Sequence, residues 1–424
     1  MLYNRRENGY SVIAKDSKFM EDTKVARNLE KEFEAVIDKE IREHRIPGAN
    51  ILVTRHGETL YSGSFGMADV ERNIPMESNT LFRMFSMSKM VTSCAAMILF
   101  ERGKIGMNDP VGMYLDGFKD QKVFNYETGK CDPLESPMTI GNLLNMTSGL
   151  CYPDEANIPT RMTIDLFDEI SKAQDAGKLT GTVDFANRMG KLPLMFKPGS
   201  RWNYGTSADV MGAVIEVVSG MRYGEFLQKE IFDPIGMNET GFYLPAGKEN
   251  RFAQVYRVLP DEADETKSRL SVYTDKSLGM EGYSKAPAFE SGGAGLVSTI
   301  EDYRKFGQAL LNGGKAENGN RILGAKTVKF MRTPAVSEEM LSVANWASLK
   351  GYGYGNFNRV LMDSARGGTN APVGEYGWDG WLGTYITLDP EDDFIFEYFI
   401  QICDSGTTEI VKRLRSIAYG MLED

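Results

Sequence analysis

The two ends of the chain alternate between helical and strand-like hydrophobic patterns. Residues 25–44 carry apolar side chains at helical spacing, and residues 49–55 and 60–66 flank a His56-Gly57-Glu58 turn, which predicts a helix followed by a β-hairpin. Near the C-terminus the pattern predicts strands over 353–361, 376–378, 383–388 and 394–402 and a final helix over 407–421. We therefore expect one antiparallel sheet built from both ends of the chain.

The middle of the chain has a different pattern. Residues 105–290 are mostly helical in their spacing, with loops rich in Pro and Gly. We predict an α+β fold in three parts: an N-terminal extension over 1–24, a sheet domain formed by 25–104 and 291–424 and flanked by helices, and a mostly helical inserted domain over 105–290. A cleft between two such parts is a common place for a ligand site.

The most strongly apolar helical pattern begins at Ser86. Its buried stripe is formed by Met87, Met90, Val91, Cys94, Ala95 and Ile98. If Ser86 opens this helix, Lys89 lies one turn away on the same face, within reach of the serine oxygen. A serine needs a neighbouring base to become a nucleophile, and a lysine can serve only when burial or positive charge lowers its pKa from about 10.4. The alternative is a helix-capping serine followed by a lysine that points to solvent.

Two later segments contain candidates for the same site. Pro198-Gly199 and a helix predicted over 207–219 leave Tyr204 on a short loop, where its phenol either faces the cleft or packs over the turn. Glycines surround Trp378 and Trp381 in the segment 374–384, a pattern typical of an edge strand that offers its NH groups to a ligand. The alternative is that the two indoles are ordinary core or surface aromatics.

Histidine and cysteine content narrows the possible chemistry. The chain has only two histidines, His44 and His56, both in polar surroundings near the N-terminus, and no Gly-x-Ser-x-Gly motif. If the protein is a hydrolase, its base must therefore be Lys or Tyr. The four cysteines show neither zinc-ligand nor disulfide-framework spacing, so we expect reduced thiols, no metal and no cofactor.

Charge and hydropathy limit the partners. The 424 residues are 42% hydrophobic and carry a formal net charge of -11, which argues against nucleic acid and anionic membrane surfaces as partners. The N-terminus lacks an apolar signal segment, and no apolar run is long enough to span a bilayer. We expect a cytoplasmic protein.

The order of Ser86-x-x-Lys89, a loop tyrosine and an x-x-Gly strand near the C-terminus resembles serine β-lactamases and penicillin-binding proteins. More specifically, the chain is similar to the family VIII carboxylesterases, relatives of class C β-lactamases, from about residue 27 onward. Further matching segments are 45–48, 82–89, 109–111, 139–150 and 291–299. The resemblance implies a β-lactamase/transpeptidase-like fold.

Two departures from the β-lactamases affect the expected substrate. Those enzymes carry Tyr-x-Asn and Lys-Thr-Gly, whereas the matching positions here read Tyr204-Gly205-Thr206 and Trp378-Asp379-Gly380. The carboxylate-binding cation is absent and Asp379 would repel an anionic lactam, whereas a neutral ester could pack on the indole of Trp378. This pattern resembles the esterase and acyltransferase branches.

The resemblance implies a carboxylesterase that acts on small-molecule esters with short or medium acyl groups through a Ser86 acyl-enzyme. Lys89 and Tyr204 would serve as general base and acid, and the sequence leaves open which of them is the base. The backbone NH groups of Ser86 and Trp381 would form the oxyanion hole.

The remaining candidates have simpler explanations as well. Substrate-binding candidates are Trp378, Asp379, Gly380 and Asn145, with Tyr283 as a secondary one. The simpler explanation is that Asn145 ends a helix and that Tyr283 packs in a loop, without a role in binding. An acyltransferase is the near alternative function, a weak β-lactamase or D,D-peptidase-like enzyme is another, and a non-catalytic binding protein is the distant one.

Overall fold

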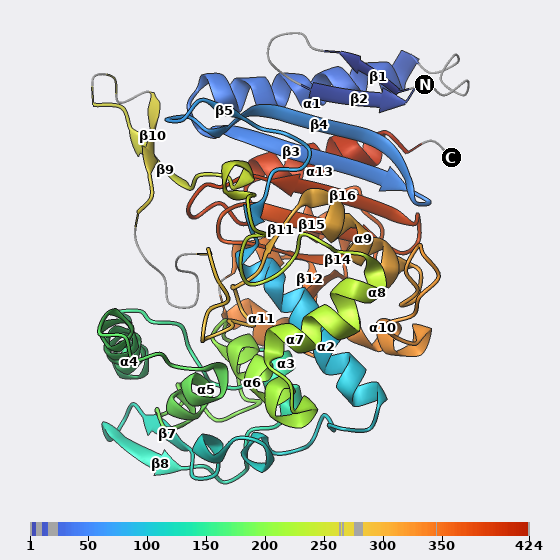
Figure 1. The fold of residues 1–424 in the computed structure, drawn as a ribbon. Coiled ribbons are helices and arrows are strands. Elements are labelled where there is room, and N and C mark those ends of the chain that lie inside the picture. The colour runs from blue at the N-terminus through green and yellow to red at the C-terminus, as the bar shows by residue number, and fades with distance from the viewer. Residues whose placement is uncertain are drawn as a thin grey trace.

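The computed structural model describes residues 2–5, 11–15, 24–262, 264, 267–274, 283–344 and 346–422 (Figure 1). Within these ranges one ten-stranded antiparallel sheet dominates the structure. Its spatial order is β1 (Leu2–Arg5), β2 (Ser11–Lys15), β4 (Glu58–Asp69), β3 (Gly48–Arg55), β16 (Phe394–Phe399), β15 (Thr384–Asp389), β14 (Tyr376–Asp379), β13 (Asn358–Leu361) and β12 (Tyr352–Gly355), with β5 (Ile74–Pro75) beside β4.

The centre of the sheet joins the two ends of the chain. β3 pairs with β16 in the register Asn50↔Phe399 through Arg55↔Phe394. Every residue of β15 and β16 is buried, because helices cover both faces of these strands. The predicted antiparallel sheet built from both termini is confirmed.

Alternate residues of β16 contact different helices, as the two-residue period of a strand requires. Phe396 stacks on Phe33 of α1 (Lys24–Arg42), and Phe394 contacts Tyr419 of α13 (Glu409–Gly420). On the opposite face, Phe399 packs against Tyr303 of α9 (Ile300–Leu311). The sheet is thus enclosed between α1 and α13 on one side and α9 on the other (Figure 1).

The helical part of the molecule lies beside this sheet (Figure 1). Its helices are α3 (Ile140–Leu144), α4 (Ile158–Asp175), α5 (Thr182–Gly190), α6 (Ser207–Ser219), α7 (Tyr223–Leu227) and α8 (Asp233–Ile235). The short hairpin β7–β8 (Lys122–Asn125, Lys130–Pro133) accompanies them, whereas the hairpin β9–β10 (Tyr256–Pro260, Ser268–Val272) lies beside the sheet (Figure 1). The predicted helix over 207–219 is confirmed, and it ends at Gly220, whose φ of 68° is the left-handed conformation that glycine adopts easily.

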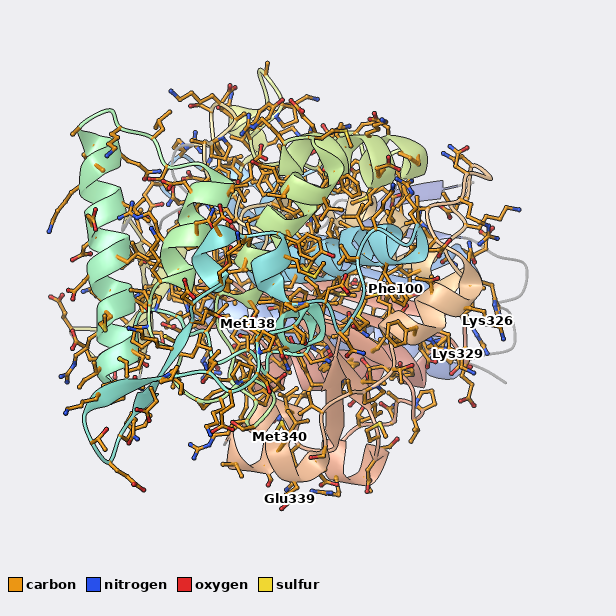
Figure 2. The ribbon with its side chains drawn as sticks, turned by 90° about the horizontal axis from the view of Figure 1, so that it is seen from below. Phe100, Met138, Lys326, Lys329, Glu339 and Met340 are labelled. Carbon is orange, nitrogen blue, oxygen red and sulfur yellow. The ribbon has the colours of Figure 1, made fainter. Side chains whose placement is uncertain are left out.

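Helix α2 (Ser88–Glu101) runs between the sheet and the helical part and is buried from Ser88 to Leu99. Its C-terminal Phe100 stacks on Phe330 of α10 (Ala325–Met331). Figure 2 shows Phe100 beside α10, whose exposed Lys326 and Lys329 point outward. The remaining short elements are β6 (Phe82–Arg83), β11 (Val297–Ser298), α11 (Glu338–Val343) and α12 (Ser364–Gly367).

One feature of the sheet differs from the sequence prediction. Residues 353–361 were expected to form one strand but form the hairpin β12–β13, because Asn356 and Phe357 adopt φ values of 49° and 60° and reverse the chain. A turn with two positive φ angles usually contains glycine at one of these positions. Here the two positions are Asn356 and Phe357, so no glycine indicates the turn in the sequence. The N-terminal hairpin β1–β2 adds to the edge of the sheet at β4.

No helix in the described ranges is both long and apolar enough to cross a membrane.

Candidate active site

Ser86 lies in a tight turn between strand β6 and helix α2. The 3-10 turn Phe85–Met87 precedes α2, so the core helix begins at Ser88, two residues later than predicted. Phe85 is held at a φ of 45°, a conformation rare for a bulky residue, and it directs the turn toward a cavity of 560 Å³. Ser86 is partly exposed and lines this cavity.

Lys89 is completely buried beneath Ser86. Its Nζ donates to Ser86 Oγ at 3.0 Å, to the hydroxyl of Tyr152 at 3.0 Å and to the carbonyl of Gly293 at 2.6 Å. All three acceptors are uncharged, so burial is the dominant influence and lowers the pKa of Lys89 to about 7. The geometry excludes the alternative in which this lysine points to solvent.

Tyr204 completes the group that the sequence singled out. Its hydroxyl accepts a hydrogen bond from Nε1 of Trp378 at 3.0 Å, and Lys89 Nζ lies 4.8 Å from its ring centroid. Burial raises the pKa of Tyr204 above the usual value for a phenol, although hydrogen bonds with Ser86 and Trp378 oppose this effect. Tyr204 is therefore a neutral phenol at ordinary pH.

Tyr152 was not among the residues selected from the sequence. It lines the cavity, and its ring centroid lies 5.8 Å from that of Tyr204. The two loops meet closely because residue 205 is glycine: a Cβ there would lie 2.3 Å from the carbonyl oxygen of Leu150. The glycine directly after Tyr204 in the sequence is the feature that could have indicated a close approach of another backbone segment to this loop.

A buried carboxylate supports Lys89 from behind. Asp209, in the first turn of α6, accepts hydrogen bonds from the Ser291 hydroxyl at 2.5 Å and from the Gly293 NH at 3.0 Å. The carbonyl of the same Gly293 accepts from Lys89. The negative charge of Asp209 favours the ammonium form and partly offsets the effect of burial on the pKa of Lys89.

The segment after β14 lies against the turn that holds Ser86. A Cβ at Gly380 would lie 2.5 Å from the Met84 carbonyl oxygen, and Thr384 Oγ1 donates to the same carbonyl at 3.0 Å. These contacts place Trp381 against Phe85, with ring centroids 5.4 Å apart. Within the described residues the backbone NH of Trp381 donates to no acceptor, so it is available to a substrate oxygen.

The other candidates take different places. Asp379 and Trp381 line the cavity, whereas the described lining residues do not include Trp378, Gly380, Asn145 or Tyr283. Trp378 is only 2% exposed, so its indole is not the packing surface for an ester that we expected; it positions Tyr204 instead.

The secondary candidates have structural roles. Asn145 caps α3 and accepts a hydrogen bond from the Asn356 NH at 3.0 Å. Tyr283 packs on Phe252, and both histidines are exposed.

Comparison with known proteins identifies the family. The family model described as Beta-lactamase matches residues 27–414. The chain belongs to the beta-lactamase family. Esterase EstB of Burkholderia gladioli is 28% identical over 84% of this chain and 86% of its own length, and protein Rv1367c of Mycobacterium tuberculosis is 30% identical over the same shares.

A solved structure extends the likeness to the fold. The structure of "EstCE1, a hydrolase with promiscuous acyltransferase activity" is 26% identical, covers 94% of this chain and 100% of its own, and has a TM-score of 0.75. The predicted β-lactamase/transpeptidase-like fold is confirmed. These relatives support a serine hydrolase of the beta-lactamase fold, of the carboxylesterase or acyltransferase kind.

Replacing Asp209 with asparagine should lower the pKa of Lys89 by about one pH unit or more. Asparagine can still accept from Ser291 and Gly293, but it removes the negative charge that favours the ammonium form. The measurement is an NMR pH titration of protein labelled with [13Cε]lysine, in which Lys89→Ala identifies the signal. Asp120→Asn removes an exposed charge as a control. An unchanged or raised pKa in Asp209→Asn would contradict this electrostatic account.

Proposed function

We propose that this protein is a carboxylesterase that hydrolyses esters of short or medium acyl chains through a covalent ester on Ser86. The observation that carries the proposal is the contact of 3.0 Å between Ser86 Oγ and the fully buried Nζ of Lys89, whose three hydrogen-bond acceptors in the described part of the chain are all neutral. The esterase among the relatives supports the same reaction class.

In the proposed acylation step, neutral Lys89 takes the proton of Ser86 as the serine oxygen attacks the ester carbonyl. Lys89 suits this role because burial lowers its pKa to about 7, whereas burial raises the pKa of Tyr204 and disfavours a phenolate base. The NH groups of Ser86 and Trp381 stabilise the oxyanion that forms, and loss of one such donor typically costs about 2.7 to 4 kcal/mol of barrier.

Collapse of the tetrahedral intermediate breaks the bond to the alcohol. Tyr204, a neutral phenol, gives its proton to the departing alkoxide and regains one from protonated Lys89. Water then attacks the Ser86 ester with Lys89 again as base, and the proton returns to Ser86 as the acid leaves. The reaction consumes one ester and one water and yields one acid and one alcohol.

Acyl transfer to an alcohol instead of water is the second candidate. EstCE1 is described as a hydrolase with promiscuous acyltransferase activity, and its structure matches nearly the whole chain. Addition of an alcohol to the assay distinguishes the two functions, since an acyltransferase would form a new ester faster than the free acid.

Ser86→Ala should reduce hydrolysis of p-nitrophenyl butyrate by at least about 1,000-fold, because the attacking oxygen is removed. The variant should also escape labelling by a fluorophosphonate while retaining the melting temperature and circular dichroism of the wild type. Ser416→Ala, an exposed serine on α13, should keep wild-type activity. Near-wild-type turnover in Ser86→Ala would exclude the proposed acyl-enzyme.

The enzyme should prefer p-nitrophenyl butyrate to a chromogenic cephalosporin by several orders of magnitude in kcat/KM. Asp379 and Asp404 line the cavity, and the lining within the described residues contains no Lys, Arg or His to bind the carboxylate of a lactam. A charge-assisted hydrogen bond of that kind contributes about 1.5 to 3 kcal/mol. Comparable efficiency with both substrates would refute the esterase assignment.

A further inference from the structure

The cavity at Ser86 combines aromatic surfaces with negative charge. Its aromatic residues include Tyr152, Tyr204, Trp346 and Trp381, and its two carboxylates belong to Asp379 and Asp404. In the described lining no cationic side chain accompanies these carboxylates. The faces of Trp and Tyr rings attract cations, and a nearby carboxylate adds to this attraction.

Trp381 is held in a fixed orientation beside one of the two carboxylates. Its Nε1 donates to Asp404 Oδ1 at 2.7 Å, and its ring packs between Phe85 and Tyr273, with centroids 5.4 and 5.6 Å away. Asp404 is exposed and adopts a φ of 60°. The indole and the carboxylate therefore form a joint surface at the mouth of the cavity.

Asp379 lies deeper, on the side of the proposed proton donor. Its carboxylate accepts a hydrogen bond from the Thr407 hydroxyl, and its charge influences both Lys89 and Tyr204. Because Tyr204 protonates the alkoxide in the proposed mechanism, the alcohol portion of the ester lies nearest to Asp379. A positive charge on that portion would also favour the neutral, reactive form of Lys89.

Arg257 of β9 is a cation near this surface. Its guanidinium lies 5.4 Å from the ring centroid of Tyr273 and forms a hydrogen bond with the Cys403 side chain. Its positive charge also attracts the carboxylate of Asp404. Arg257 is not among the described lining residues, so it offsets part of the charge of Asp404 from outside the cavity. We therefore expect Asp379 to contribute more than Asp404.

We propose that the cavity selects esters whose alcohol portion carries a quaternary ammonium or similar permanent cation. This inference rests on the proposed esterase function and specifies its substrate class. Asp379 and Asp404 supply the charge, and Trp381 and its aromatic neighbours supply the surface for the alkylated nitrogen.

Two thioesters of equal shape test the proposal: butyrylthiocholine and S-(3,3-dimethylbutyl) thiobutyrate, which replaces the nitrogen with carbon. Thiol release gives kcat/KM for each. The wild type should favour the cation, and Asp379→Asn should reduce the ratio of the two kcat/KM values about fivefold or more, with a smaller reduction for Asp404→Asn. The asparagine in Asp379→Asn can still accept from Thr407, and the asparagine in Asp404→Asn can still accept from Trp381. The comparison therefore isolates the effect of the negative charge.

Comparison of one ratio across variants cancels the different leaving-group reactivities of the two thiols. In Asp379→Asn and Asp404→Asn the weaker preference for the cationic thioester should appear mainly as a higher KM for butyrylthiocholine. The control variant Asp120→Asn should leave the ratio of the two kcat/KM values unchanged. An unchanged ratio in both Asp379→Asn and Asp404→Asn would overturn the proposal.

Calorimetry with Ser86→Ala separates this inference from the proposed function. Butyrylcholine should bind more tightly than 3,3-dimethylbutyl butyrate, and the difference should shrink when Asp379→Asn is added. Equal binding of the two esters would refute cation selection even if the wild type hydrolyses p-nitrophenyl butyrate. A binding preference without any turnover would uphold cation selection and refute the esterase function.

Discussion

The site depends on the burial of one lysine whose direct hydrogen-bond partners are all neutral. Lys89 is 0% exposed, and among the described residues it donates only to Ser86, Tyr152 and Gly293. A carboxylate in direct contact would stabilise the ammonium and make it a poor base, whereas burial alone favours the neutral amine. Asp209 lies behind Gly293 and accepts a hydrogen bond from its NH, and among the described residues no ion pair joins Asp209 to Lys89.

The fold provides this environment by bringing distant segments together. α2 packs against α6, and Ser86 precedes it in a turn that contacts β14 and β15 of the sheet. Glycines at 205 and 380 permit backbone approaches that a Cβ would prevent. A sheet formed from both ends of the chain therefore delivers the candidate oxyanion donor, and the helical part delivers Tyr152, Tyr204 and Asp209.

Local patterns were sufficient to predict much of this arrangement. The helices α1 and α6 and the hairpin β3–β4 follow from periodicity and turn residues, and the i, i+3 spacing on a helix explains why Ser86 and Lys89 could be paired from the sequence. Tyr152 and Asp209 were missed because their roles arise from contacts between separate loops. Trp378 was misinterpreted for the same reason: only the folded structure shows that its indole faces Tyr204 and is buried.

The most direct test of the central claim is the pH dependence of kcat/KM for p-nitrophenyl butyrate in the wild-type enzyme. Lys89 must be neutral to accept the Ser86 proton, and burial lowers its pKa to about 7. The rate should therefore fall tenfold for each pH unit below that value and level off above it. A rate that is constant from about pH 5 to 8, or that rises only near the ordinary lysine pKa of about 10.4, would contradict the account.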